Sequence, residues 1–173
     1  MRELKYHEKK LLRKVDLVEW KGTSTQREHI STFKYQLESR ETYTKYNIIV
    51  GKIRRLALAL AKLNDNDETK IHLSKELSQK LYSLGIIGSK TLLECSKVCV
   101  GSFCKRRLSS VMVDVKMVPD IKTAVTFVKQ GHVKVGIETT TDPGQIISRA
   151  MEDYLGWREG SKVKETVQEF NEG

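Results

Sequence analysis

The spacing of the apolar residues changes at Gly131, and this change restricts the fold more than any other feature of the chain. Before it, apolar residues recur every three or four positions, which predicts an amphipathic helix from Pro119-Asp120 to Gly131. After it, apolar and polar residues alternate, which is typical of a half-buried strand. The apolar positions are Ile121, Ala124, Val125 and Val128 in the helix and Val133, Val135 and Ile137 in the strand. A helix and a strand therefore share one small unit, and we expect an α+β protein.

This unit is predicted to extend from Phe103 to Ser148 as two short helices followed by a hairpin. The first helix is predicted from apolar positions on one face, namely Cys104, Leu108, Val111, Met112 and Val115. Its opening turn would hold Lys105-Arg106-Arg107, where cations are unfavourable unless an anion such as phosphate lies opposite them. Asp142-Pro143-Gly144 predicts a turn, after which 145–148 would return as the partner strand.

Two stretches of this unit resemble the S4-type RNA-binding domain of ribosomal proteins: 104–108, which reads Cys-Lys-Arg-Arg-Leu, and 121–135, which ends in Gly-His-Val-Lys-Val. The resemblance implies RNA binding by a basic rim. We expect the RNA-binding residues of the unit to be Lys105, Arg106, Arg107, Lys122, Lys129, His132 and Lys134. For His132, a hydrogen bond to phosphate or ribose and a structural role are both open. Reversing the triplet 105–107 to Glu is expected to abolish RNA binding and leave the fold intact.

The net charge of +9 is unevenly distributed over the 173 residues. Residues 1–55 carry 14 Lys and Arg against 7 Asp and Glu, and residues 96–135 carry 8 against 2. Residues 136–173 carry only 4 against 8. Basic blocks of this kind are typical of polyanion binding, although a solvated surface is the alternative. The acidic end is more easily interpreted as a surface that faces protein.

An N-terminal helix is predicted over 4–20, with an apolar face and a basic stripe. The stripe holds Lys5, Lys9, Lys10, Arg13 and Lys14, which we expect to contact RNA. Docking on an acidic protein is an equal interpretation, and a membrane-surface helix is a third that the narrow apolar face disfavours. The run 4–21 and the ending Met151-Glu-Asp-Tyr154 are similar to the S4-domain family of the U3 small nucleolar ribonucleoprotein. That resemblance implies three partners: U3 small nucleolar RNA, precursor ribosomal RNA and a scaffold protein of the small-subunit processome. It also implies that the protein is located in the nucleolus.

The remaining segments define the expected organisation. Loop composition over 22–31 predicts a flexible joint, and apolar periodicity predicts helices over 41–63 and 71–84. We therefore expect a basic N-terminal extension (1–32), a helical scaffold (33–102), the S4-type unit (103–158) and an acidic tail (159–173) that is either a frayed helix or disordered. Tyr154 and Trp157 suit a core or protein contact as well as base stacking.

The chain lacks the short motifs of phosphate-binding loops, zinc proteases and serine hydrolases, so we expect no enzyme and no cofactor. Cys95, Cys99 and Cys104 have no spacing typical of a zinc site, and reduced thiols in a reducing compartment are the better interpretation. No apolar run approaches about 18 residues, so a soluble intracellular protein is expected. The expected function is assistance of U3 RNA pairing with precursor ribosomal RNA. The alternatives are a structural small-subunit ribosomal protein and, third, an S4-bearing RNA-modifying enzyme.

Overall fold

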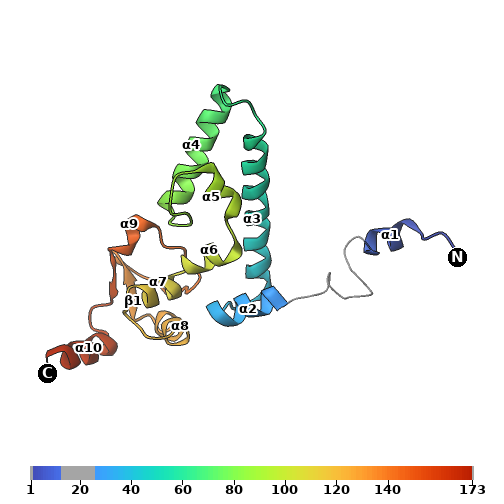
Figure 1. The fold of residues 1–173 in the computed structure, drawn as a ribbon. Coiled ribbons are helices and arrows are strands. Elements are labelled where there is room, and N and C mark those ends of the chain that lie inside the picture. Colours follow the sequence, from blue (N-terminus) through green and yellow to red (C-terminus); the bar gives the residue numbers. More distant parts are fainter. Residues whose placement is uncertain (1, 13–25, 173) are drawn as a thin grey trace.

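The structure is a computed structural model, and it describes residues 2–12 and 26–172 (Figure 1). The described residues form an N-terminal group of helices and a C-terminal group of helices and strands. The first group comprises α1 (Tyr6–Leu12), α2 (Gln26–Tyr35), α3 (Arg40–Ala61), α4 (Glu68–Ser83), α5 (Leu92–Lys97) and α6 (Val100–Lys105). The second comprises α7 (Leu108–Asp114), α8 (Ile121–Lys129), β1 (Val133–Val135), β2 (Glu138–Thr139), α9 (Arg149–Glu152), β3 (Leu155–Trp157) and α10 (Lys162–Glu172).

The long helix α3 organises the first group, as the sequence predicts. Ser39 caps the N-terminus of α3 by accepting a hydrogen bond from the Thr42 N–H. The turn that follows α3 ends at Asp67, which caps α4 by accepting a hydrogen bond from the Thr69 N–H. One face of α3 buries Tyr46, Val50, Ala57 and Leu60. This face packs against α4, α5 and α6, which all lie on one side of α3 in Figure 1. The first core forms along that side.

A second core lies between α7, α8 and a small antiparallel sheet of order β2-β1-β3. Its fully buried side chains are Leu108, Met112, Val128, Val133 and Ile147. The prediction of α8 is confirmed: Asp120 precedes it, Ala124 and Val128 are buried, and Gly131 follows with φ +75°, a conformation that favours glycine. The α+β class is confirmed with it.

The predicted first helix of this unit is wrong, because the chain forms two helices there. Lys105 ends α6, and Arg107 precedes α7 in an extended conformation with ψ 146°. The extended backbone lets Arg107 form a bridge with Ile146, and the Leu108 N–H donates to the Gln145 carbonyl at 2.8 Å. The basic triplet therefore marks a break between helices and not the first turn of one.

The predicted hairpin partner is also wrong. The strand that returns after β1 is β2, through a turn at Gly136 and Ile137 in which Gly136 has φ +65°. Ile137 is fully exposed in this turn, so β1 ends at Val135, two residues before the last apolar position of the predicted strand. Residues 145–148 are instead hydrogen-bonded to the chain between α6 and α7, and the side chain of Ile147 is buried in the second core. The other neighbour of β1 is β3.

Two expected boundaries fall inside helices. The segment predicted as a loop over 22–31 forms part of α2 from Gln26 onward, so α2 spans the expected boundary at residue 32. Helix α6 spans the one at residue 102. The predicted N-terminal helix is described over Tyr6–Leu12, and 13–20 lie outside the described residues. No helix in the described ranges is both long and apolar enough to cross a membrane.

Candidate nucleic-acid interface

The basic triplet is not one exposed patch, contrary to the sequence-based expectation. Arg107 is only 2% exposed, and its Nη1 donates to the Tyr46 hydroxyl at 3.3 Å. Arg106 donates to the Ile147 carbonyl from Nε at 3.0 Å and from Nη2 at 2.8 Å. Its two Nη atoms also contact the Glu152 carboxylate at 3.0 Å. Only Lys105 is exposed, because the break between α6 and α7 turns the two arginines inward.

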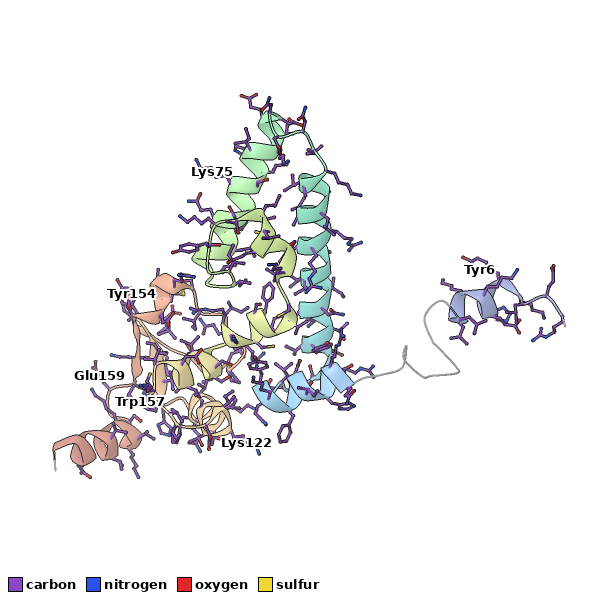
Figure 2. The ribbon with its side chains drawn as sticks, in the orientation of Figure 1. Tyr6, Lys75, Lys122, Tyr154, Trp157 and Glu159 are labelled. Carbon is purple, nitrogen blue, oxygen red and sulfur yellow. The ribbon has the colours of Figure 1, made fainter. Side chains whose placement is uncertain are left out.

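His132 and Lys134 form a second group, on the sheet. His132 Nδ1 lies 2.9 Å from the Ser161 hydroxyl, and the imidazole meets the Phe127 ring edge-on. Lys134 Nζ pairs with Glu159 at 3.0 Å. Both side chains thus connect β1 to the segment before α10, where Figure 2 shows Glu159 beside Trp157. They are occupied within the chain, and the structural role left open for His132 is the one its contacts support.

The predicted lysines of α1 are exposed on a helix without buried residues, while Arg13 and Lys14 lie outside the described residues. The exposed N-terminal lysines are Lys5, Lys9 and Lys10. These cations are available to a partner, but nothing in the fold orients them toward the other predicted residues.

Lys122 and Lys129 are brought together on the side of α8 that faces α2. Lys122 Nζ lies 5.6 Å from the centre of the Phe33 ring, within the range of a cation–π contact. Lys129 pairs with Glu38, which follows α2, at 2.8 Å. Hydrogen bonding to Lys129, and then the charges of Lys129 and Arg107, lower the pKa of the Glu38 carboxyl. Helix α2 is therefore part of the same surface as α8.

We call this region the α2 surface and define it by Arg27, Phe33, Lys34, Arg54 and Lys122. All five side chains are exposed, and Phe33 is 75% exposed despite its size. Helix α2 supplies the first three, α3 supplies Arg54, and α8 supplies Lys122. Lys34 and Lys122 share a cleft with the exposed Phe33 ring, and Arg27 and Arg54 lie on the other side of α2. Cations beside an exposed aromatic ring can bind phosphates and stack bases.

A cleft of about 420 Å³ lies between α2, α3 and the start of α6. Arg27, Lys34 and Arg54 line it, together with the aromatic rings of Tyr35 and Tyr43. None of its lining residues is acidic. Arg54 is held in place because its Nε donates to the Val98 carbonyl at 2.7 Å. The cleft has the charge and the ring surfaces that a nucleotide requires.

Cys99 is one of the residues that line this cleft. A hydrogen bond with the Ser102 side chain, the N–H groups of Ser102 and Gly101, and the charge of Arg54 together lower the pKa of Cys99. Burial of Cys104 has the opposite effect and raises its pKa to about 11. The lower pKa of Cys99 is thus due mainly to its hydrogen bond with Ser102, and the charge of Arg54 adds a smaller effect.

A second cleft, of about 460 Å³, lies on the other side of α2 and faces α8. Phe33, Lys34 and Lys122 line it, and Asp120 adds one negative charge. Lys34 thus borders both clefts. A strand of RNA that follows α2 would meet cations on both sides and the Phe33 ring between them.

Sequence reasoning missed α2 because Gly22-Thr-Ser-Thr25 gives the segment the composition of a loop. The overlooked signal is the spacing of Ile30, Phe33 and Leu37, which repeats every three or four residues.

Within the described residues, no three His, Cys, Asp or Glu side chains gather as metal ligands would. The cations of the α2 surface are instead suited to binding a polyanion.

Comparisons with known proteins extend over most of the chain. The profile of the ribosomal protein S4/S9 N-terminal domain matches residues 3–100. The U3 small nucleolar ribonucleoprotein protein IMP3 of Homo sapiens is 40% identical across 99% of this chain and 95% of its own length. The protein of the same name from Saccharomyces cerevisiae is 41% identical across 96% of this chain and 92% of its own length. The small ribosomal subunit protein uS4 of Sulfurisphaera tokodaii is 26% identical across 84% of this chain and 82% of its own length.

Proposed function

Because the chain belongs to the family of the U3 small nucleolar ribonucleoprotein protein IMP3, we propose that it is an RNA-binding component of that ribonucleoprotein and acts in small-subunit ribosome biogenesis. The observation that carries the proposal is the end-to-end likeness to proteins that bear this name. The α2 surface supplies the chemistry, because its cations and its exposed ring suit single-stranded RNA. The relatives are named as ribonucleoprotein and ribosomal proteins, and we propose a role without catalysis.

The proposed mechanism is electrostatic. Cations of the α2 surface, with Lys105 and the lysines of α1, would neutralise phosphates of U3 small nucleolar RNA and of precursor ribosomal RNA. Lower repulsion between the two strands would favour their pairing without an energy source. Phe33 would hold an unpaired base by stacking during this exchange.

We further propose a protein partner and a compartment. A ribonucleoprotein of this kind acts in the nucleolus, where a scaffold protein of the processome would hold it beside the RNA. The acidic end is one candidate face, with Tyr154 68% exposed next to β3 (Figure 2). The basic helix α1 is the other.

A structural small-subunit ribosomal protein is the second candidate, and the likeness to uS4 is the observation that favours it. It is the weaker candidate, because that likeness has lower identity and covers less of the chain than the likeness to IMP3. An S4-bearing RNA-modifying enzyme remains third, since the described residues supply no catalytic constellation to support it.

Crosslinking of the protein to RNA in cells, followed by sequencing of the bound RNA, tests the proposal. We expect reads on U3 small nucleolar RNA and on the leading part of precursor ribosomal RNA. Reads confined to mature small-subunit RNA would instead identify a ribosomal protein. A protein without bound RNA would contradict both.

Paired variants connect the experiment to the α2 surface. Lys34→Glu with Lys122→Glu should remove most U3 reads, because both changes place negative charge beside the RNA. Lys75→Glu with Lys80→Glu is the matched control, since both lysines are exposed on α4, far from α2 (Figure 2). Equal loss in the two double variants would mean that only net charge matters.

A further inference from the structure

Exposed apolar side chains lie along α3 and in the turn that follows it, where Leu63 lies two residues beyond the last helical residue, Ala61. Ile49, Leu56 and Leu63 recur every seven residues and are 41%, 44% and 41% exposed. Lys52 and Ala59 lie between them, so the five positions alternate in steps of three and four. We call this stripe the outer seam. Such spacing is that of the contact line between two packed helices.

The charge along the outer seam has one sign. Lys45, Arg55 and Lys62 flank the stripe and are exposed, and Lys52 lies within it. Between Thr42 and Asn64 the chain has no Asp or Glu. Figure 1 shows α3 at the edge of the helical group, with α4, α5 and α6 all on one side of it. An exposed apolar line with basic side chains beside it therefore runs along α3 and into the turn after it.

We infer that the outer seam docks an acidic amphipathic helix of a partner protein. Leucine-type side chains of that helix would cover Ile49, Leu56 and Leu63, and its flanking carboxylates would pair with the flanking cations. The inference concerns a protein partner and shares no residue with the α2 surface, so it does not rest on the RNA site proposed there.

Other occupants fit the outer seam less well. A second copy of α3 would place its own lysines and Arg55 against identical cations, and α1 is itself basic. RNA would pair with the cations but would leave Ile49, Leu56 and Leu63 in contact with phosphates or water. A membrane surface requires a broad apolar face, whereas this seam is narrow and contains Lys52 at its centre.

The test measures binding of a designed fluorescent peptide to the full chain by fluorescence anisotropy. The peptide is a helix of about four heptads with Leu at positions a and d and Glu at e and g, and its control carries Lys at e and g. We expect the Glu peptide to bind and the Lys peptide not to bind. Absence of binding by the Glu peptide, or equal binding by both, would overturn the inference.

Matched variants separate the outer seam from a general apolar effect. Leu56→Ser should weaken binding of the Glu peptide by about tenfold or more, because it removes the central contact. Leu58→Ser is the control, since Leu58 is 57% exposed on the same helix but lies off the seam. Lys52→Glu with Arg55→Glu should weaken binding as Leu56→Ser does. Equal effects of Leu56→Ser and Leu58→Ser would contradict docking at the seam.

Further readouts identify the wrong occupant if the inference fails. Light scattering that shows a dimer lost on Leu56→Ser would assign the seam to a second copy. Affinity for a U3 RNA fragment that falls with Lys52→Glu and Arg55→Glu, but not with Leu56→Ser, would assign it to RNA. Binding to anionic phospholipid vesicles that is lost on Leu56→Ser would assign it to a membrane. Each of these outcomes overturns the inference.

Discussion

Arg107 is a cation held almost entirely out of water at the point where the two cores meet. The Tyr46 hydroxyl accepts from its Nη1, while its Nε has no hydrogen-bond partner among the described residues. A buried guanidinium with incomplete hydrogen bonding is costly, so the position is constrained by the fold around it. Two further arginines make contacts between the N-terminal and C-terminal groups. Arg106 donates to the Ile147 carbonyl, and Arg149 donates to the Ile87 carbonyl at 2.9 Å and lies 4.1 Å from the centre of the Tyr82 ring. Arginine contacts thus join the two halves.

We predict that Arg107 and Lys105, two members of the basic triplet, have different effects when changed singly. Arg107→Glu should lower the free energy of unfolding by more than about 3 kcal/mol, because it buries an unpaired carboxylate where a cation was held. Lys105→Glu should change it by less than about 0.5 kcal/mol, because Lys105 is exposed. Urea unfolding followed by circular dichroism measures both. A stable Arg107→Glu protein would refute the buried role of Arg107. It would also support the sequence-based expectation that the fold tolerates Glu at all three positions of the triplet.

The basic triplet also shows where sequence reasoning reaches its limit at this scale. Three consecutive cations indicate a high local charge, but which of them meets solvent depends on the backbone direction at Arg106 and Arg107. That direction is set by the bridge between Arg107 and Ile146, which are 39 positions apart along the chain. Local periodicity contains no information about such a contact.

At the scale of elements, the turn after α4 is fitted closely to Arg106. Gly85 has φ +74°, and a Cβ atom added there would lie 2.8 Å from Arg106 Nε. Gly51 lies in the middle of α3, and a Cβ atom added there would have no neighbour within 4 Å. The same chemical change therefore meets opposite surroundings at the two glycines.

We predict opposite effects of alanine at these positions. Gly85→Ala should destabilise the protein by about 1–3 kcal/mol, since a side chain is strained at positive φ and would displace Arg106. Gly51→Ala should stabilise it by about 0.5–1 kcal/mol, because alanine is the better helix former. Thermal unfolding of the two variants and of the parent protein measures these changes as shifts of the unfolding temperature. Shifts of the same sign would show that the turn is not constrained as described.

Elements with local signals are the ones that the sequence predicts correctly. Helices α3, α4 and α8 carry a repeat of three to four residues, and α3 and α4 also begin at a side-chain cap. Their predicted ranges agree with the structure to within a few residues. The partners of β1 are wrongly predicted, since β3 lies about twenty positions further on and its pairing is not encoded in a turn. Helix α2 was missed for a different reason, the loop-like residues just before it.

For the whole molecule, the placement of charge matters more than its sum. The α2 surface gathers cations from α2, α3 and α8, whereas Lys134 and Arg106 are paired with carboxylates elsewhere. Sequence reasoning identified Lys122 as a candidate because it lies in the S4-type unit. It could not identify Arg27, Lys34 and Arg54, since these side chains line one cleft only when α2 packs against α3 and α6. Lys34 shares a cleft with Lys122 only when α2 packs beside α8.

We predict that the salt dependence of RNA binding reports this placement. Each phosphate contact contributes about 0.7–0.9 to the slope of log affinity against log salt concentration. Lys34→Ala with Lys122→Ala should therefore reduce the slope by roughly 1.5. Lys75→Ala with Lys80→Ala removes the same charge and should leave the slope unchanged. Filter binding of a U3 RNA fragment across a salt series measures both, and equal slopes for the two variants would count against a localised site.

The joining of α2 to α8 has a consequence for how the protein is made. Lys34 emerges from the ribosome long before Lys122, and only the finished C-terminal half completes the second cleft beside Phe33. A chain cut short before α8 therefore cannot display the whole α2 surface, however well its first core folds. We therefore expect a chain that ends before α8 to bind RNA more weakly than the full chain, because it lacks Lys122 and the second cleft.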